Sequence, residues 1–260
     1  NIAQLFNYNV MFTGFGWFSK RITCYLEKKT MKIATANIFS NNWGADYAVN
    51  HYNISPKKVH VCRFGSNMPV PKTWKEKEIK QNKPLELLFI AGRWELKGGD
   101  IAYDAYKILK DKGLSVNFTV VGCTPNLNDD SVVIIPFINK NTSEGLRELI
   151  TIFKNTDILF LPTRNDCSPI VMCEASGYGI PSITTITGGV HEIILNDYNG
   201  YTLPLEAQGN DFAEIIEKLV KNPIRLRELS SNARKRYEDE LNWEKWGLDV
   251  DNIIKNILLS

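Results

Sequence analysis

Short apolar runs alternate with amphipathic helical patterns from Leu85 onward, and this alternation limits the possible folds more than any other feature. The run LELLFIA at 85–91 lies between Pro84 and Gly92, which is typical of a buried strand. Further strands are predicted at 116–121, 132–135, 158–161 and 181–185, and helices at 100–112, 143–154 and 170–178. Strands alternating with helices of about 10 to 15 residues predict a parallel sheet with helices on both faces. We therefore expect an α/β fold with a Rossmann-like sheet.

The rest of the chain divides around this region. Residues 68–84 (MPVPKTWKEKEIKQNKP) hold three prolines and many lysines, which favours an exposed linker. Before it, helices at 19–29 and 43–52 and strands at 36–40 and 58–63 indicate an incomplete α/β fragment. After Ala207, helices are predicted at 212–221, 224–240 and 243–259. The predicted domains are 1–67, the remnant of an N-terminal domain; 68–84, the linker; 85–240, the Rossmann-like domain; and 241–260, a C-terminal helix.

Composition excludes several function classes. Lys and Arg number 31 against 29 Asp and Glu, and a net charge of +2 provides no general attraction for nucleic acid. No apolar run reaches the roughly 18 residues that a membrane span needs. The five cysteines are scattered without a CxxC pair, which argues against disulfides and a zinc site and favours the cytoplasm. The first ten residues lack a signal-peptide pattern and a starting Met, so a longer protein is expected.

The first candidate binding segment is GRWELKGG at 92–99, between a predicted strand and a helix. In parallel α/β sheets, ligands bind beyond the carboxyl ends of the strands. Gly92 and its neighbouring glycines allow close approach of an anion, while Arg93 and Lys97 supply positive charge. The segment is neither a P-loop nor a GxGxxG motif. A solvated turn with two surface cations is an equally good interpretation of this segment alone.

The second segment, DCSPIVMCE at 166–174, follows the strand DILFLPTR. Asp166 and Glu174 lie eight residues apart, across a loop and the first turn of a helix. Carboxylates accept hydrogen bonds from sugar hydroxyls, so the pair suits a sugar-bearing ligand. Taken alone, a capping Asp and a surface Glu explain the segment as well. The small neighbours of Glu174 nevertheless predict burial, where an unpaired carboxylate is costly.

The third segment is TGGVHE at 187–192, again after a strand. Gly188 and Gly189 at a helix start would allow a ligand to approach closely. A structural turn is the simpler interpretation of this segment alone.

The succession of GRWELKGG, LPTRND-CSPIVMCEASGYGIPSITT, TGGVHEI and NGYTLP resembles the donor half of the family 4 glycosyltransferases with the GT-B fold. The resemblance covers most of Leu85–Leu203 and is most specific in the central segment. Residues 37–67 resemble the end of that family's N-terminal domain. Residues 243–259 resemble its C-terminal helix, which crosses back to that domain.

This resemblance implies a retaining transfer of a glycosyl group from a nucleotide sugar, UDP- or GDP-linked, without a cofactor or metal ion. Arg93 and Lys97 would hold the donor diphosphate, Asp166 the transferred sugar, and Glu174 the ribose hydroxyls. Further donor contacts are implied at Ser168, Pro169, Ile170, Gly92, Phe137, Ile138, Gly188 and Gly189. The acceptor would be a saccharide or a lipid-linked saccharide. Any contact with a membrane is expected from the N-terminal domain.

Two departures from the family pattern affect these roles. Asp166 stands where the family usually has Glu, and the shorter side chain would change or weaken sugar binding. The spacing from Arg93 to Lys97 is tighter than in many relatives, so Lys97 is the firmer assignment. A noncatalytic nucleotide-sugar-binding or assembly module stays open as an alternative, because the first βαβ units of the acceptor domain are missing.

Other motifs carry less weight. Gly14-Phe15-Gly16 matches half of a dinucleotide-binding fingerprint, without a clear preceding strand or the third glycine. Asp249-Val250-Asp251 matches a metal-binding DxD, but it falls within a helical pattern and is expected to be a solvated face. No segment marks the Schiff-base lysine of a pyridoxal-dependent phosphorylase.

Overall fold

A computed structural model describes residues 2–6, 8, 14–76 and 83–259 of the chain. The chain forms two compact units, one made of Asn1–Gly65 and Asn242–Ser260 and the other of Ser66–Leu241. We call them unit 1 and unit 2. The glycine pair at 14–16 immediately precedes a helix, but residues 9–13 before it lie outside the described part of the chain.

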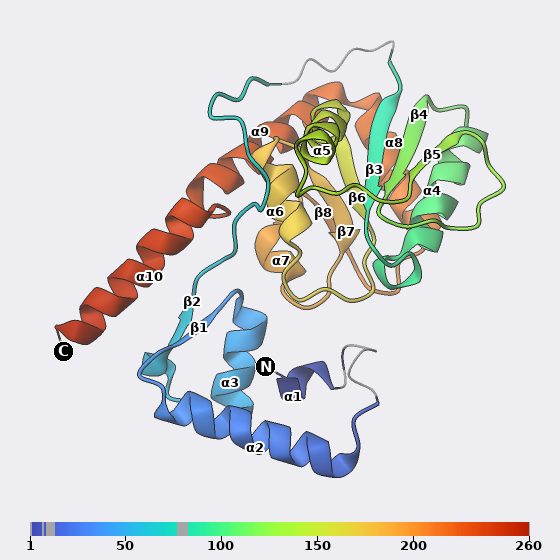
Figure 1. The fold of residues 1–260 in the computed structure, drawn as a ribbon. Coiled ribbons are helices and arrows are strands. Elements are labelled where there is room, and N and C mark those ends of the chain that lie inside the picture. Colours follow the sequence, from blue (N-terminus) through green and yellow to red (C-terminus); the bar gives the residue numbers. More distant parts are fainter. Residues whose placement is uncertain (1, 7, 9–13, 77–82, 260) are drawn as a thin grey trace. The chain divides into compact units, whose positions relative to one another are not determined.

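Unit 2 is built on a six-stranded parallel sheet with the order β5-β4-β3-β6-β7-β8 (Figure 1). The strands are β3 (Leu85–Ile90), β4 (Val116–Val121), β5 (Val132–Ile135), β6 (Ile158–Leu161), β7 (Ser182–Thr185) and β8 (Gly200–Leu203). All residues of β6 and β7 are buried, as expected of strands that are covered on both faces. The predicted Rossmann-like parallel sheet is confirmed.

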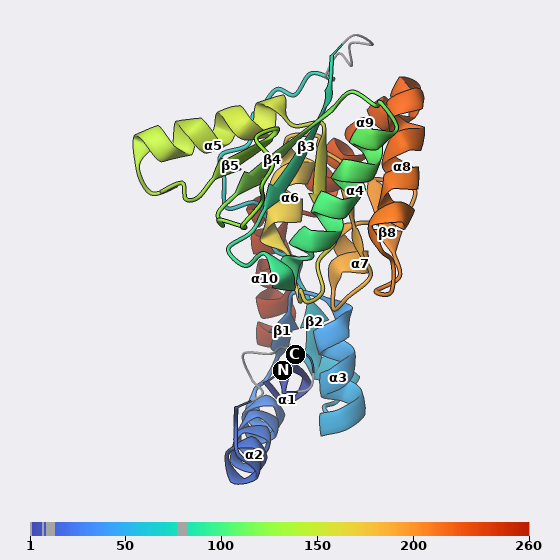
Figure 2. The same ribbon diagram turned by 90° about the vertical axis from the view of Figure 1, so that its right-hand side faces the viewer.

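Helices cover both faces of this sheet. They are α4 (Gly99–Asp111), α5 (Ser143–Asn155), α6 (Ile170–Gly177), α7 (Val190–Ile193), α8 (Gly209–Lys221) and α9 (Pro223–Asp239). Figure 2 shows α5 on one side of the sheet and α4 and α8 on the other. Rings from several elements form the core: Phe89 lies 6.4 Å from Phe118, and Phe160 lies 5.5 Å from Phe212, measured between ring centroids.

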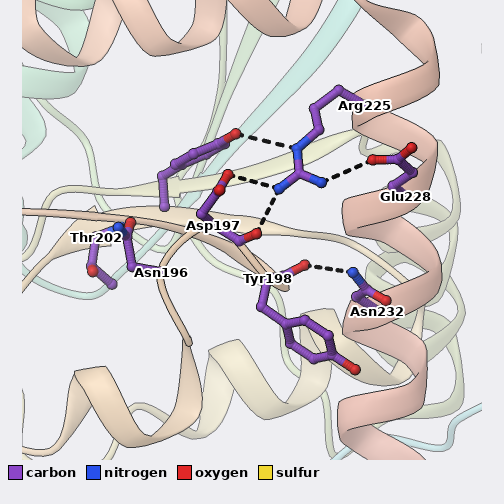
Figure 3. Close-up of polar contacts among 8 residues, drawn as sticks. Asn196, Asp197, Tyr198, Thr202, Arg225, Glu228 and Asn232 are labelled. Atoms are coloured by element: carbon purple, nitrogen blue, oxygen red, sulfur yellow. Dashed lines mark hydrogen bonds and ion pairs between the residues drawn. The ribbon is translucent and has the colours of Figure 1, made fainter.

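The edge strand β8 was not predicted, because GYTL is short and carries no clear alternation of apolar and polar residues. The structure forms it through pairing with β7 and through the loop that precedes it. Figure 3 shows how Arg225 of α9 holds this loop, donating to the backbone oxygen and the carboxylate of Asp197 at 2.5 and 2.7 Å. Asn232 of the same helix donates to the backbone oxygen of Tyr198 at 2.9 Å. The register of β8 therefore depends on contacts that are distant in sequence.

In the part of the predicted linker at 68–76, five of the nine residues are exposed, but Met68, Val70 and Trp74 pack against the rest of unit 2. Met68 is only 5% exposed, and the side chains of Val70 and Trp74 lie against Gly177 and Gly179. An ideal Cβ on either glycine would come within 2.5–2.6 Å of these side chains. Because residues 177 and 179 are glycines, which have no side chain, this segment can pack closely against them. Residues 77–82 of the predicted linker lie outside the described residues.

Unit 1 holds α1 (Ile2–Leu5), α2 (Trp17–Ile33), α3 (Asn42–Tyr52), α10 (Trp243–Leu258) and the parallel strands β1 (Asn37–Phe39) and β2 (Val59–Val61). Its small core contains Phe6, Ala48, Tyr52 and Ile54. Two 3₁₀ turns, Pro56–Lys58 in unit 1 and Glu95–Lys97 in unit 2, were not predicted. Asp249 and Asp251 lie in α10, where each pairs with a lysine four residues away, as expected of a solvated helix face.

Candidate functional site

The three predicted segments meet at one edge of the sheet of unit 2. They follow β3, β6 and β7, which are neighbours in the sheet, so their carboxyl ends lie together. The backbone N–H of Arg164, two residues before the second segment, donates to the backbone oxygen of Leu96 at 3.0 Å and so joins the first segment to the chain that leads into the second. The N–H of Gly189 donates to Cys167 at 3.1 Å, joining the third to the second. The fold thus brings together residues that are almost a hundred positions apart.

The glycines of the first segment are explained by packing. Gly98 has a φ of 74°, and an ideal Cβ there would lie 2.0 Å from the backbone oxygen of Pro162. A Cβ on Gly99 would lie 2.1 Å from the buried ring of Trp94. Gly92, in contrast, is exposed and has no such neighbour, so a ligand can approach its backbone. The close packing at Gly98 fixes the position of Lys97 beside it.

Lys97 is directed toward the second segment. Its ammonium donates to the backbone oxygen of Asn165 at 3.0 Å and to the carboxylate of Asp166 at 2.5 Å. The side chains of Lys97 and Asp166 are 23% and 14% exposed, so a ligand can reach the pair. The structure therefore brings these two predicted residues together. Arg93 is exposed on the same loop.

Glu174 lies on α6 and is only 7% exposed. Burial raises the pKa of its carboxyl above the ordinary value of 4.5. The ammonium of Lys140 and a hydrogen bond donated by the backbone N–H of Asn67 oppose that rise. The predicted burial of Glu174 is confirmed, and the surface alternative for it is wrong.

The remaining predicted contacts surround these groups. Pro169 is buried at the N-cap of α6, with Ser168 and Ile170 half-buried beside it. N–H groups at a helix start favour an anion, although that of Met172 already donates to the backbone oxygen of Pro169 at 3.0 Å. Gly188 adopts a φ of 52°, and the N–H of Gly189 already donates to Cys167. This engagement supports the simpler interpretation of the third segment as a structural turn.

The loop after β5 completes the same edge. Phe137 is 75% exposed, and Ile138 is half-buried against the core. Lys140 follows them and acts electrostatically on Glu174. Sequence reasoning missed Lys140, Asn165 and Asn67. The rule that ligands bind at the carboxyl ends of strands would have pointed to Lys140, whereas the other two act through backbone groups that leave no signal in residue type.

Within the described ranges, no cluster of three or more His, Cys, Asp or Glu side chains is arranged to hold a metal ion. The same part of the chain includes no helix that is long and apolar enough to cross a membrane. The five cysteines, all within the described ranges, form no disulfide.

Comparison with known proteins identifies the class. The family model described as "Glycosyl transferases group 1" matches residues 71–236, and the chain belongs to this family. The chain is 25% identical over 249 residues to N,N'-diacetylbacillosaminyl-diphospho-undecaprenol alpha-1,3-N-acetylgalactosaminyltransferase of Campylobacter jejuni. It is 26% identical over 247 residues to the capsular polysaccharide biosynthesis glycosyltransferase CapM of Staphylococcus aureus. These matches cover 89% and 87% of the chain but only 64% of each relative.

Solved structures show the same fold. Sucrose-phosphate synthase of Thermosynechococcus elongatus matches with a TM-score of 0.70 at 15% identity, over 99% of this chain and 66% of the other. HepE of Anabaena, solved in complex with UDP and glucose, also matches with a TM-score of 0.70, at 14% identity over 93% of this chain and 67% of the other. The resemblance to the GT-B glycosyltransferases is confirmed.

Proposed function

We propose that this chain supplies the nucleotide-sugar site of a retaining glycosyltransferase, in which Lys97, Asp166 and Glu174 face the donor. The ion pair between Lys97 and Asp166, at the junction of three loops beyond the sheet, carries this proposal. In this pair an ammonium lies beside a carboxylate, and a carboxylate can accept hydrogen bonds from sugar hydroxyls. A sugar diphosphate needs both groups at one place.

The chemistry follows from these groups. In the reaction, the bond between the sugar C1 and the diphosphate oxygen breaks, and C1 forms a bond to the oxygen of an acceptor hydroxyl, whose proton passes to the leaving diphosphate. Lys97, with Arg93 on the same loop, would stabilise the negative charge that develops on the leaving diphosphate. The N–H groups at the start of α6 would help to stabilise the same negative charge. Asp166 would accept a hydrogen bond from a hydroxyl of the transferred sugar, and Glu174 from the ribose.

Relatives suggest the class of the other substrates. The complex of HepE with UDP supports a uridine nucleotide as the first donor to test. The diphospho-undecaprenol named for the Campylobacter relative supports a lipid-linked saccharide as the acceptor. The name of the Staphylococcus relative supports polysaccharide biosynthesis as the process in which this chain takes part.

A calorimetric titration with UDP, GDP, UDP-glucose and GDP-mannose tests the donor site. We expect one base to bind, and both Lys97→Ala and Glu174→Ala to weaken that binding about tenfold or more, since each removes a charged hydrogen-bonding group. Arg147→Ala is the control, because Arg147 is exposed on α5 and its guanidinium pairs with Glu144 of the same helix. Equal binding by all four proteins would overturn the proposed site.

A noncatalytic nucleotide-sugar-binding or assembly module is the second candidate function. A module of this kind would bind the nucleotide sugar and transfer nothing. Glycosyl transfer to a lipid-linked saccharide by the intact polypeptide would exclude it, whereas nucleotide binding alone fits both functions.

A further inference from the structure

The segment from Ser66 to Trp74 lies against the helix that carries Glu174. The hydroxyl of Tyr178 donates to the backbone oxygen of Pro69 at 2.6 Å, and the indole N–H of Trp74 donates to the backbone oxygen of Tyr178 at 3.2 Å. The close contacts of Val70 with Gly177 and of Trp74 with Gly179, described above, belong to the same segment. We call Ser66–Trp74 the strap. Its contacts hold it along the end of α6 without help from regular secondary structure.

The strap also reaches Glu174 itself. Glu174 and Tyr178 are four residues apart, which is about one helical turn, so both lie on the face that the strap follows. Near the start of the strap, the Ser66 hydroxyl accepts from the N–H of Met68 at 3.1 Å and donates to its backbone oxygen at 2.9 Å. These two hydrogen bonds form a tight turn around Asn67. The backbone N–H of Asn67 donates to the carboxylate of Glu174.

A buried carboxylate needs hydrogen-bond donors, and its two oxygens offer about four acceptor positions. One donor from the strap leaves capacity for the hydroxyls of a ligand. The same bond limits the rotation of the carboxylate about its side-chain torsions. A fixed orientation reduces the entropy lost when a ligand binds.

We propose that the strap positions Glu174 for the nucleotide, with the Asn67 N–H as the direct contact and Tyr178 as the anchor. This inference rests on the proposed function, because it assigns Glu174 to the nucleotide. Asn67 and Tyr178 are positioning residues that act through Glu174. The predicted linker thus takes part in the binding site.

The test uses two pairs of variants in the full chain. Asn67→Pro removes the backbone N–H, whereas Asn67→Ala keeps it. Tyr178→Phe removes the hydroxyl that anchors the strap. Tyr106→Phe is its matched control. It removes the hydroxyl of a buried tyrosine that contacts the hydroxyl of Ser131 at 2.9 Å and takes no part in the proposed site. The readouts are calorimetric binding of UDP and GDP, and titration of the Glu174 carboxyl by carbon NMR, assigned with Glu174→Gln.

We expect Asn67→Pro and Tyr178→Phe to weaken nucleotide binding about five- to tenfold, the usual effect of one lost hydrogen bond to a charged group. Both should also move the midpoint of the carboxyl titration upward, because a bond to the ionised form is lost. Asn67→Ala and Tyr106→Phe should change neither readout. A role limited to stability would lower the unfolding temperature without moving the midpoint.

The outcomes separate the two proposals. If Glu174→Gln weakens binding while Asn67→Pro and Tyr178→Phe bind and titrate like the unaltered chain, the positioning role is overturned and the proposed function stands. If the unaltered chain binds neither nucleotide, the proposed function is overturned and the positioning role with it. Should Asn67→Pro fail to fold, Tyr178→Phe against Tyr106→Phe decides the question.

Discussion

Asp166 has two separable effects on a donor. Its carboxylate accepts a hydrogen bond from the ammonium of Lys97, and in a complex with donor it would face the transferred sugar. The diphosphate of either ligand must compete with this carboxylate for Lys97, but only a nucleotide sugar can also donate a hydrogen bond from a sugar hydroxyl to the carboxylate. Asp166 is therefore expected to weaken the binding of the free nucleotide and to strengthen the binding of the nucleotide sugar.

We predict that Asp166→Asn weakens binding of the nucleotide sugar about fivefold or more but leaves binding of the free nucleotide unchanged or tighter. The amide lacks the charge that holds Lys97 and is a weaker acceptor for a sugar hydroxyl. Parallel calorimetric titrations with UDP and UDP-glucose, or with the guanosine pair, measure this difference. An equal loss for both ligands would contradict the assignment of Asp166 to the sugar.

Glu174 gives the site a pH dependence. Its carboxyl has a pKa raised by burial, and the groups that interact with it are Lys140, the N–H of Asn67, the thiol of Cys173 and the hydroxyl of Tyr178. Since the ionised form is the better acceptor for ribose hydroxyls, binding should weaken as the pH falls through this raised pKa. The loss should therefore begin above the ordinary Glu value of 4.5.

Nucleotide affinity measured at several pH values checks this prediction, with Glu174→Gln as the control that should remove the dependence. Stability should change with the opposite sign. The folded protein binds this proton more tightly than the unfolded chain, so the contribution of Glu174 to stability falls as the pH rises through the same range. An affinity that is constant over this range would argue against a contact between Glu174 and the ligand.

At the scale of the element, the turn between η3 (Glu95–Lys97) and α4 is closely packed. Gly98→Ala would place a Cβ 2.0 Å from the backbone oxygen of Pro162 at a left-handed φ. We expect a loss of about 2 kcal/mol or more in the free energy of unfolding, together with weaker nucleotide binding, since Lys97 precedes this turn.

Chemical denaturation measures that loss. Gly247→Ala is the control, because Gly247 lies within α10 with no atom within 4 Å of the added Cβ, and it should stabilise the protein by about 0.5–1 kcal/mol. A Gly98→Ala protein as stable as the unaltered chain would show that the loop relaxes without strain.

The sequence predicted those elements whose apolar pattern is long and regular. The strand run at 85–91 and the helical face of 143–154 correspond to β3 and α5 within a few residues. The strand β8 and the packed strap could not be predicted, since both depend on partners far away along the chain. The meeting of Lys97 with Asp166 followed from the rule for parallel sheets, whereas the backbone contact of Asn67 with Glu174 depends on tertiary packing alone.

At the scale of the whole molecule, unit 2 is continuous in sequence and holds every residue that we assign to the donor. We predict that residues 66–241 alone fold cooperatively and bind the nucleotide within about threefold of the full chain. Thermal unfolding followed by circular dichroism and calorimetric titration provide the measurements. A truncated chain that folds but binds more than about tenfold more weakly would mean that unit 1 contributes to the site.

Unit 1, in contrast, is assembled from two distant parts of the chain. Gly65 ends one part, and an ideal Cβ on it would lie 2.4 Å from the backbone nitrogen of Trp243, near the start of the other. During translation, α10 emerges from the ribosome only after all of unit 2 has been made. Because domains generally fold as units while they are synthesised, unit 2 can fold before the contact between Gly65 and Trp243 is made.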